Sequence, residues 1–89
     1  MTLPNIDCAR IVRNGGIDAM AALNAALTDA IAGFPALDQE KLKLRFGRAM
    51  AEITTEIINP AVAAFPELEP DENTWKSVAK VRAIARAYA

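Results

Sequence analysis

The sequence predicts an all-α protein, a small bundle of three principal helices. Apolar residues recur at three- and four-residue steps along two long stretches, which is the periodicity of one helix face. Alanine, the residue with the highest helix propensity, accounts for 19 of the 89 residues. Glycine and proline separate the helical stretches. At this length we expect a single domain, residues 1–89, with one modest core.

The first principal helix is expected at residues 17–33, where Gly33 or Pro35 ends it. Asp18 falls in its first turn, where a negative charge suits the helix dipole. The apolar face of this helix consists of Ile17, Met20, Leu23, Leu27, Ile31 and Phe34.

A glycine pair before this helix predicts a break in the chain. The run Asn-Gly-Gly at 14–16 is typical of a helix stop. Residues 5–14 fit a short helix with Asn5 as its N-cap. They also fit an extended arm, because they include two adjacent β-branched residues, Ile11 and Val12.

The longest helix is expected at residues 38–59. Asp38 is suited to cap its start, with Leu37 and Leu42 placed to form a hydrophobic staple across that cap. Pro60 predicts its end, because proline disfavours helical dihedrals in the residue before it; the alternative is a kinked continuation to residue 64. The inward face consists of Leu42, Phe46, Ala49, Met50, Ile53 and Ile57.

The last helix is expected at residues 71–88. Asp71 is suited as its N-cap and belongs to an acidic loop, residues 67–72. The apolar face consists of Trp75, Val78, Val81, Ala85 and Tyr88, whereas Lys76, Lys80, Arg82 and Arg86 lie largely elsewhere.

The residue composition argues against catalysis. The chain has no histidine, which removes Ser-His-Asp and Cys-His arrangements and histidine zinc sites. Its single cysteine, Cys8, has no partner for a disulfide and fits a small buried apolar side chain. Glu52 and Glu56 could bind magnesium together with acids of loop 67–72, but that loop contains Pro70 and is not expected to be helical. We therefore predict no enzymatic activity, no cofactor and no metal site.

The distribution of charge is the best clue to function. Residues 38–48 carry a net charge of +2, residues 49–72 carry six acids and no base, and residues 73–89 carry four bases and no acid. In the central helix the bases therefore precede the acids, which is opposite to what the helix dipole favours. An antiparallel pair of two copies would place each basic half against the acidic half of its partner, so we predict a homodimer. The predicted interface consists of Lys41, Arg45, Arg48, Glu52 and Glu56 as rim charges and Leu44 and Ile58 as contact residues.

Other uses of these charges stay open at the level of sequence. The bases could be solvated in a monomer, pair with loop 67–72 of the same chain, or dock on a partner protein. Nucleic-acid binding through the last helix is disfavoured by the net charge of −1 and by the adjacent acids. A small ligand could bind between the helices, lined by Trp75, Tyr88, Phe46 or the methionines.

The sequence carries no signal for a membrane. The alanine-rich stretch 19–32 is interrupted by Asn24 and Asp29, and no window approaches the roughly 18 apolar residues of a membrane helix. A single cysteine gives no indication of an oxidising compartment. We therefore expect a cytoplasmic, non-catalytic protein that acts by self-association or by docking on a partner protein.

Overall fold

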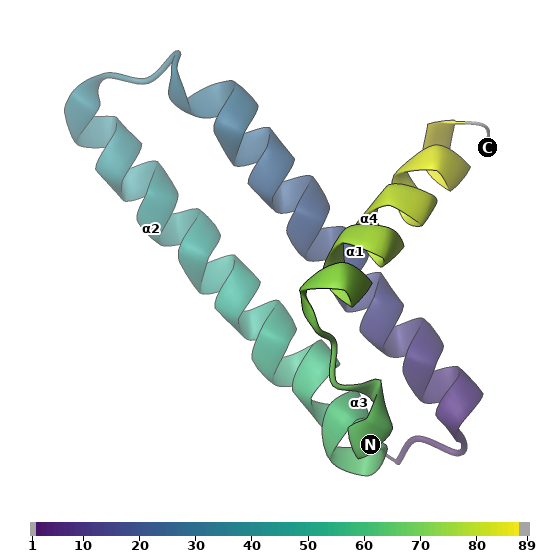
Figure 1. Cartoon of the computed structure of the whole chain (residues 1–89). Helices are drawn as coiled ribbons and strands as arrows, with labels where there is room; N and C mark the ends of the chain where they lie inside the picture. The colour runs from purple at the N-terminus through teal and green to yellow at the C-terminus, as the bar shows by residue number, and fades with distance from the viewer. Residues whose placement is uncertain (1, 88–89) are drawn as a thin grey trace.

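The computed structural model describes residues 2–87 and confirms the all-α prediction. Three principal helices, α1, α2 and α4, account for most of that range, which contains no strand. The first two run antiparallel and side by side (Figure 1). In chain order the elements are α1 (Ile6–Ile31), α2 (Ala36–Ile53), the π-helical turn η1 (Thr54–Ile58), α3 (Asn59–Ala64), the 3-10 turn η2 (Pro66–Leu68) and α4 (Glu72–Ala87).

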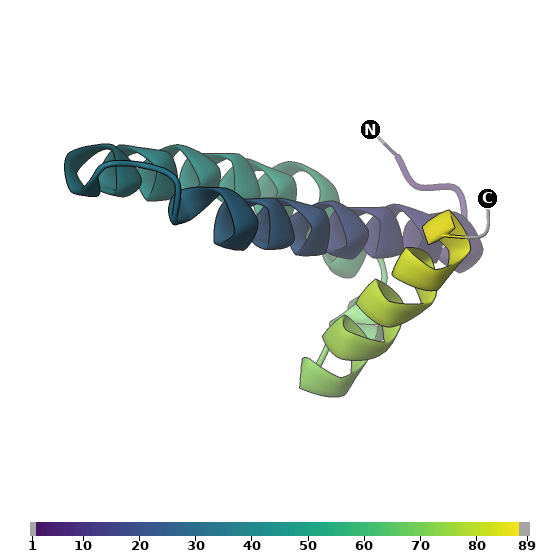
Figure 2. The same ribbon diagram turned by 90° about the horizontal axis from the view of Figure 1, so that it is seen from above.

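The helices form two layers of unequal size. Seen from above, α1 and α2 lie in one layer, and α4 projects from one side of it (Figure 2). The overall dimensions are 46 × 29 × 22 Å, with a radius of gyration of 14.7 Å. A compact domain of this length has a radius of gyration of about 12 Å, so the molecule is extended.

The predicted break at 14–16 is wrong, because α1 continues through it as one helix of 26 residues. No glycine in the described range has a positive φ, so Gly15 and Gly16 keep helical dihedrals. Each glycine inside a helix costs about 1 kcal/mol relative to alanine. Tertiary packing offsets this cost at Gly16, which is buried against η1.

The contact at Gly16 is a close approach between two elements that are far apart in sequence. A Cβ built on Gly16 would lie 2.7 Å from Cγ1 of Ile58 and 3.2 Å from Cγ2 of Ile57. Only glycine leaves room for these side chains, and Ile58 is 3% exposed as a result. The segment 5–14 is therefore helical and continuous with the predicted helix 17–33, rather than a separate arm.

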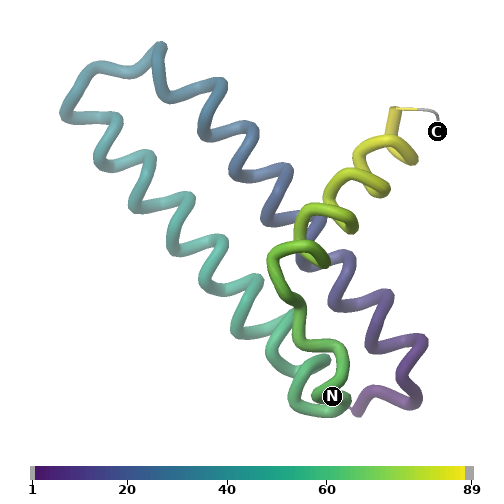
Figure 3. The backbone as a smooth tube through the Cα atoms, in the orientation of Figure 1, coloured from purple at the N-terminus to yellow at the C-terminus, as the bar shows by residue number. Residues whose placement is uncertain are grey.

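The helical path continues past Pro60 (Figure 3), which confirms the alternative prediction of a continuation to residue 64. Proline lacks an N–H, and its ring collides with the carbonyl four residues earlier in a regular α-helix. The chain accommodates this by a π-helical turn just before it, in which the N–H of Asn59 donates to the carbonyl of Thr54. The wider turn allows helical structure to continue to Ala64.

Two of the three predicted caps are confirmed. Oδ1 of Asn5 accepts from the N–H of Cys8 at 2.8 Å, and Oδ1 of Asp71 accepts from the N–H of Thr74 at 2.7 Å. Asp38 is not a cap, because α2 begins two residues before it, after Pro35.

The expected staple at the start of α2 also fails, since Leu37 is 83% exposed. Tyr88, assigned to the apolar face of the last helix, lies outside the described residues.

The buried core lies at one end of the layer formed by α1 and α2. Ala9, Ala61 and Leu68 form its buried cluster, covered by half-buried Leu3, Ile6 and Phe65. Arg13, which is 8% exposed, closes this end by donating from Nη1 to the carbonyl of Leu68 at 2.9 Å. Its Nε and Nη2 donate to Oδ1 of Asn14 at 3.0 and 2.7 Å, so the chain segment after α3 is tied to α1 by a satisfied polar group.

Replacing Gly16 should destabilise the fold. For Gly16→Ala we expect a loss of about 1–3 kcal/mol of unfolding free energy, the usual cost of overpacking, because the new Cβ would lie only 2.7 Å from Cγ1 of the buried Ile58. Gly15→Ala is the matched control, since its Cβ would meet nothing within 4 Å; it should be neutral or stabilising by up to about 1 kcal/mol. Denaturant titration at one protein concentration compares the two variants, and equal midpoints would contradict the close approach.

The cap of α4 should respond to acid. The N–H and then the hydroxyl of Thr74 donate to Asp71 and hold the pKa of its carboxyl below the usual range. A lowered pKa stabilises the folded state above the pKa of the unfolded chain, and this contribution is lost as pH falls through the folded value. We expect hydrogen exchange at the Thr74 amide to accelerate, relative to the intrinsic rate, below the ordinary titration range of aspartate. Asp71→Asn should show no such acid transition.

Candidate functional site

The outward face of α2 is uncovered in this structure. None of the 18 residues of α2 is buried. The side turned toward α1 is half-buried and includes Leu42, Phe46 and Met50, as the periodicity predicts. On the opposite side Leu37 is 83% exposed and Leu44 is 56% exposed. Residues seven apart share a helix face, so these two leucines and the exposed Ala51 form one outward stripe.

The five predicted rim charges are all exposed; four of them lie on α2 with the stripe, and Glu56 lies in the π-helical turn η1. Within residues 2–87 none of the five makes an ion pair; the one ion pair on α2 joins Lys43 to Glu40 at 3.5 Å. The three bases precede the two acids along the chain: the bases lie on α2, Glu52 lies in its last turn, and Glu56 lies in η1. The rim charges are Lys41, Arg45, Arg48, Glu52 and Glu56.

The acidic loop 67–72 does not serve as the partner of these bases. It lies at the other end of the layer from the basic half of α2 (Figure 1). One of its members, Glu72, pairs instead with Lys76 at 3.1 Å, one turn along α4. The intrachain alternative for the α2 bases therefore has no contact to support it among the described residues.

Most bases of α4 form ion pairs with acids of the same chain. Asp18, whose side chain is 18% exposed, is paired with both Arg82 and Arg86. These contacts hold α4 across α1 and leave little free positive charge for phosphate binding on that helix. Asp18 was predicted in the first turn of a helix, but α1 begins at Ile6, so Asp18 lies in the middle of this helix and pairs with residues of α4.

Ile58 lies inside the subunit rather than on the outward face. It is 3% exposed and packs against the backbone of Gly16. The helical phase used to place it on the outward face assumed regular α-helix, and the π-helical turn η1 alters that phase. Leu37 is the exposed apolar residue that the sequence analysis assigned to a staple instead, so we exchange Ile58 for Leu37 in the candidate surface.

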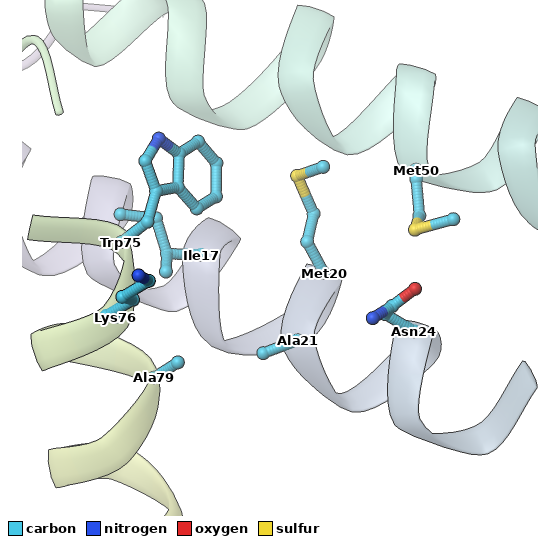
Figure 4. A pocket seen from close by; sticks show the side chains of 8 residues that line it. All are labelled: Ile17, Met20, Ala21, Asn24, Met50, Trp75, Lys76 and Ala79. Atoms are coloured by element: carbon cyan, nitrogen blue, oxygen red, sulfur yellow. The ribbon is translucent and has the colours of Figure 1, made fainter. Parts of the chain in front are cut away.

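A second uncovered feature is an apolar groove of about 380 Å³ between α1, α2 and α4 (Figure 4). Trp75 and Ile17 lie at one end of the groove, and Met50 lies at the other end. Met20 lies between these two ends. Trp75 and two methionines were among the residues expected to line a ligand site, whereas Phe46 is absent from the lining. The lining residues are Ile17, Met20, Ala21, Asn24, Met50, Trp75, Lys76 and Ala79.

The exposed surface is large for a chain of this size. A compact monomer of 9.6 kDa exposes about 5,100 Å² by the usual scaling of surface with mass. This chain exposes 6149 Å². The excess of about 1,000 Å² is comparable to the roughly 800 Å² that each partner buries in a standard protein interface.

No group of three or more His, Cys, Asp or Glu side chains is placed to hold a metal ion within residues 2–87. No helix in that range has the length and apolar character needed to cross a membrane. Searches of protein-family models, curated proteins and solved structures returned no match to this chain.

Proposed function

We propose that this protein is non-catalytic and acts by self-association, as a homodimer paired along α2. The observation that carries the proposal is the excess of about 1,000 Å² of exposed surface over a compact monomer of this mass. A second copy would bury the outward stripe of α2 with residues of the same kind, because a two-fold pair places the same stripe on both sides of the interface. Docking of the same face on a different protein is the alternative within this proposal.

The unpaired charges of α2 support an antiparallel arrangement. With the helices antiparallel, the basic half of one copy faces the acidic half of the other, so Lys41 comes opposite Glu56 and Arg45 comes opposite Glu52. Each exposed ion pair contributes about 0–1 kcal/mol, which orients the partners but does not hold them together.

Apolar contacts supply the attraction. Burying Leu37 and Leu44 of both copies contributes at most roughly 12 kcal/mol, at about 1.5–3 kcal/mol for each leucine. The loss of translational and rotational freedom on association costs roughly 4–15 kcal/mol. The two terms are of similar size, so the affinity of the pair depends on how much further surface is buried. A cytoplasmic location belongs to the same proposal.

A dimer held in this way should respond to charge reversal. Light scattering on the wild type is expected to show twice the chain mass, with the dissociation constant rising as salt is added. Glu52→Lys combined with Glu56→Lys should weaken the dimer tenfold or more, because four attractive pairs become repulsive. Lys41→Glu combined with Arg45→Glu should do the same.

Mixing these two double variants provides the control. Each variant repels its own copies, but a mixed pair has four matched charge pairs, so heterodimers should form at concentrations where each variant alone is monomeric. A monomeric wild type at every salt concentration would overturn self-association. Variants that stay dimeric when measured alone would overturn the antiparallel charge pairing.

The groove supports a second candidate function, the binding of a small apolar molecule. Its volume of about 380 Å³ lies at the lower end of the 300–1,000 Å³ typical of ligand pockets, and methionine side chains adapt to varied apolar shapes.

The single tryptophan of the chain, Trp75, reports directly on this groove. A series of apolar probes such as 8-anilinonaphthalene-1-sulfonate and decanol should change its emission if the groove takes ligands. Met50→Ala should weaken that response, and Ile11→Ala is the control, because Ile11 is 66% exposed on α1 and does not line the groove. An unchanged emission spectrum across the series would argue against this function.

A further inference from the structure

Gly47 is a glycine that the isolated subunit does not require. It lies inside α2, is exposed, and a Cβ built on it would meet nothing within 4 Å. A glycine at such a position lowers the stability of the helix by about 1 kcal/mol relative to alanine, and no close contact inside the chain compensates for this loss. Gly16 offers the contrast, because the same construction there collides with Ile58.

Gly47 belongs to the uncovered stripe of α2. It is three residues after Leu44 and four residues before Ala51, so the three share one face of the helix. Leu44 is 56% exposed, and Ala51 is exposed as well. A large side chain is thus followed by two small ones on a face that stays exposed among residues 2–87.

We infer that the two copies of α2 cross at Gly47, with Leu44 of each copy packed over the small residues Gly47 and Ala51 of the other. This inference rests on the proposed self-association and specifies its register and its closest contact. The occupant of the outward face is a second copy of this chain. Interaxial distances between packed helices run from about 8 to 10 Å depending on the residues at the contact, and glycine permits the short end of that range.

Two independent considerations place the two-fold axis at nearly the same position. Setting Leu44 opposite Ala51 of the partner puts the axis between Gly47 and Arg48. Setting Lys41 opposite Glu56 and Arg45 opposite Glu52 puts it between Arg48 and Ala49. These positions differ by one residue, or about 1.5 Å along the helix. Shape and charge therefore favour one register.

The excess of exposed area is large enough for an interface with a second copy of the chain. The chain exposes about 1,000 Å² more than a compact monomer of its mass, against roughly 800 Å² per partner in a standard interface. The five rim charges have no ion-pair partners within residues 2–87, and the bases among them are complementary to the acids across a two-fold axis.

Cysteine cross-linking tests the register directly. In a Cys8→Ser background, Gly47→Cys places two thiols beside the axis, within the 4.4–6.8 Å between Cα atoms that a disulfide spans. We expect oxidation to produce a covalent dimer rapidly at concentrations where the parent is dimeric. Ala26→Cys, on an exposed position of α1, is the control and should remain uncross-linked.

Affinity measurements give a second readout that does not depend on thiol chemistry. Gly47→Leu should raise the dissociation constant of the dimer at least tenfold while circular dichroism shows helix content unchanged. Gly15→Ala is the matched control for glycine replacement within a helix, because its Cβ also meets nothing within 4 Å, and it should leave the dissociation constant unchanged.

The outcomes separate the two proposals. A wild-type dimer that neither cross-links at Gly47→Cys nor weakens with Gly47→Leu would overturn the crossing at Gly47 and leave self-association standing. A monomeric wild type would overturn both. Cross-linking together with weakening supports the crossing.

Discussion

The close approach of Ile58 to the backbone of Gly16 is the contact on which the rest of the fold depends. It joins α1 to the rod formed by α2, η1 and α3, at the point where the regular helix gives way to a π-helical turn. Because Gly16 has no side chain, α1 can remain helical there despite the cost of two adjacent glycines. The same contact fixes the position of α3, whose Ala61 enters the buried cluster beside Ala9.

A core placed at one end has consequences for the other elements. Its buried residues come from α1, η1, α3 and η2, so α2 and α4 contribute none. Beyond the core, α1 and α2 are held along a half-buried apolar seam, and their outward surfaces are left to solvent. The extended shape and the large exposed area both follow from this position of the core.

The two basic helices differ in what they do with their charge. On α4 the guanidinium groups of Arg82 and Arg86 are paired with Asp18, so charge there serves to hold a helix that has no buried residue of its own. On α2 only Lys43 and Glu40 form an ion pair within residues 2–87, and the exposed Lys41, Arg45, Arg48 and Glu52 form none. Charges of both signs along one uncovered face are what an antiparallel self-complementary contact uses, and this distinction between the two helices is visible only once the ion pairs are known.

Apolar periodicity and cap chemistry were sufficient to predict the all-α class, the approximate extents of α2 and α4 and the caps at Asn5 and Asp71, since these depend on residues a few positions apart. The predicted interface charges on α2 stay exposed, because their phase follows from the same periodicity. Predictions from neighbouring residues were wrong where a contact with a residue far along the chain determines the structure. The glycine pair does not stop α1 because Ile58 packs against Gly16, and Ile58 is buried rather than outward because the turn before Pro60 is π-helical. Leu37 is exposed rather than packed in a staple, and Asp18 pairs with residues of α4 rather than acting on a helix start. The sequence by itself thus determined helix content and the charge of each helix, which are local properties, whereas the tertiary structure alone decided which faces are covered, because burial depends on contacts between segments far apart in the chain.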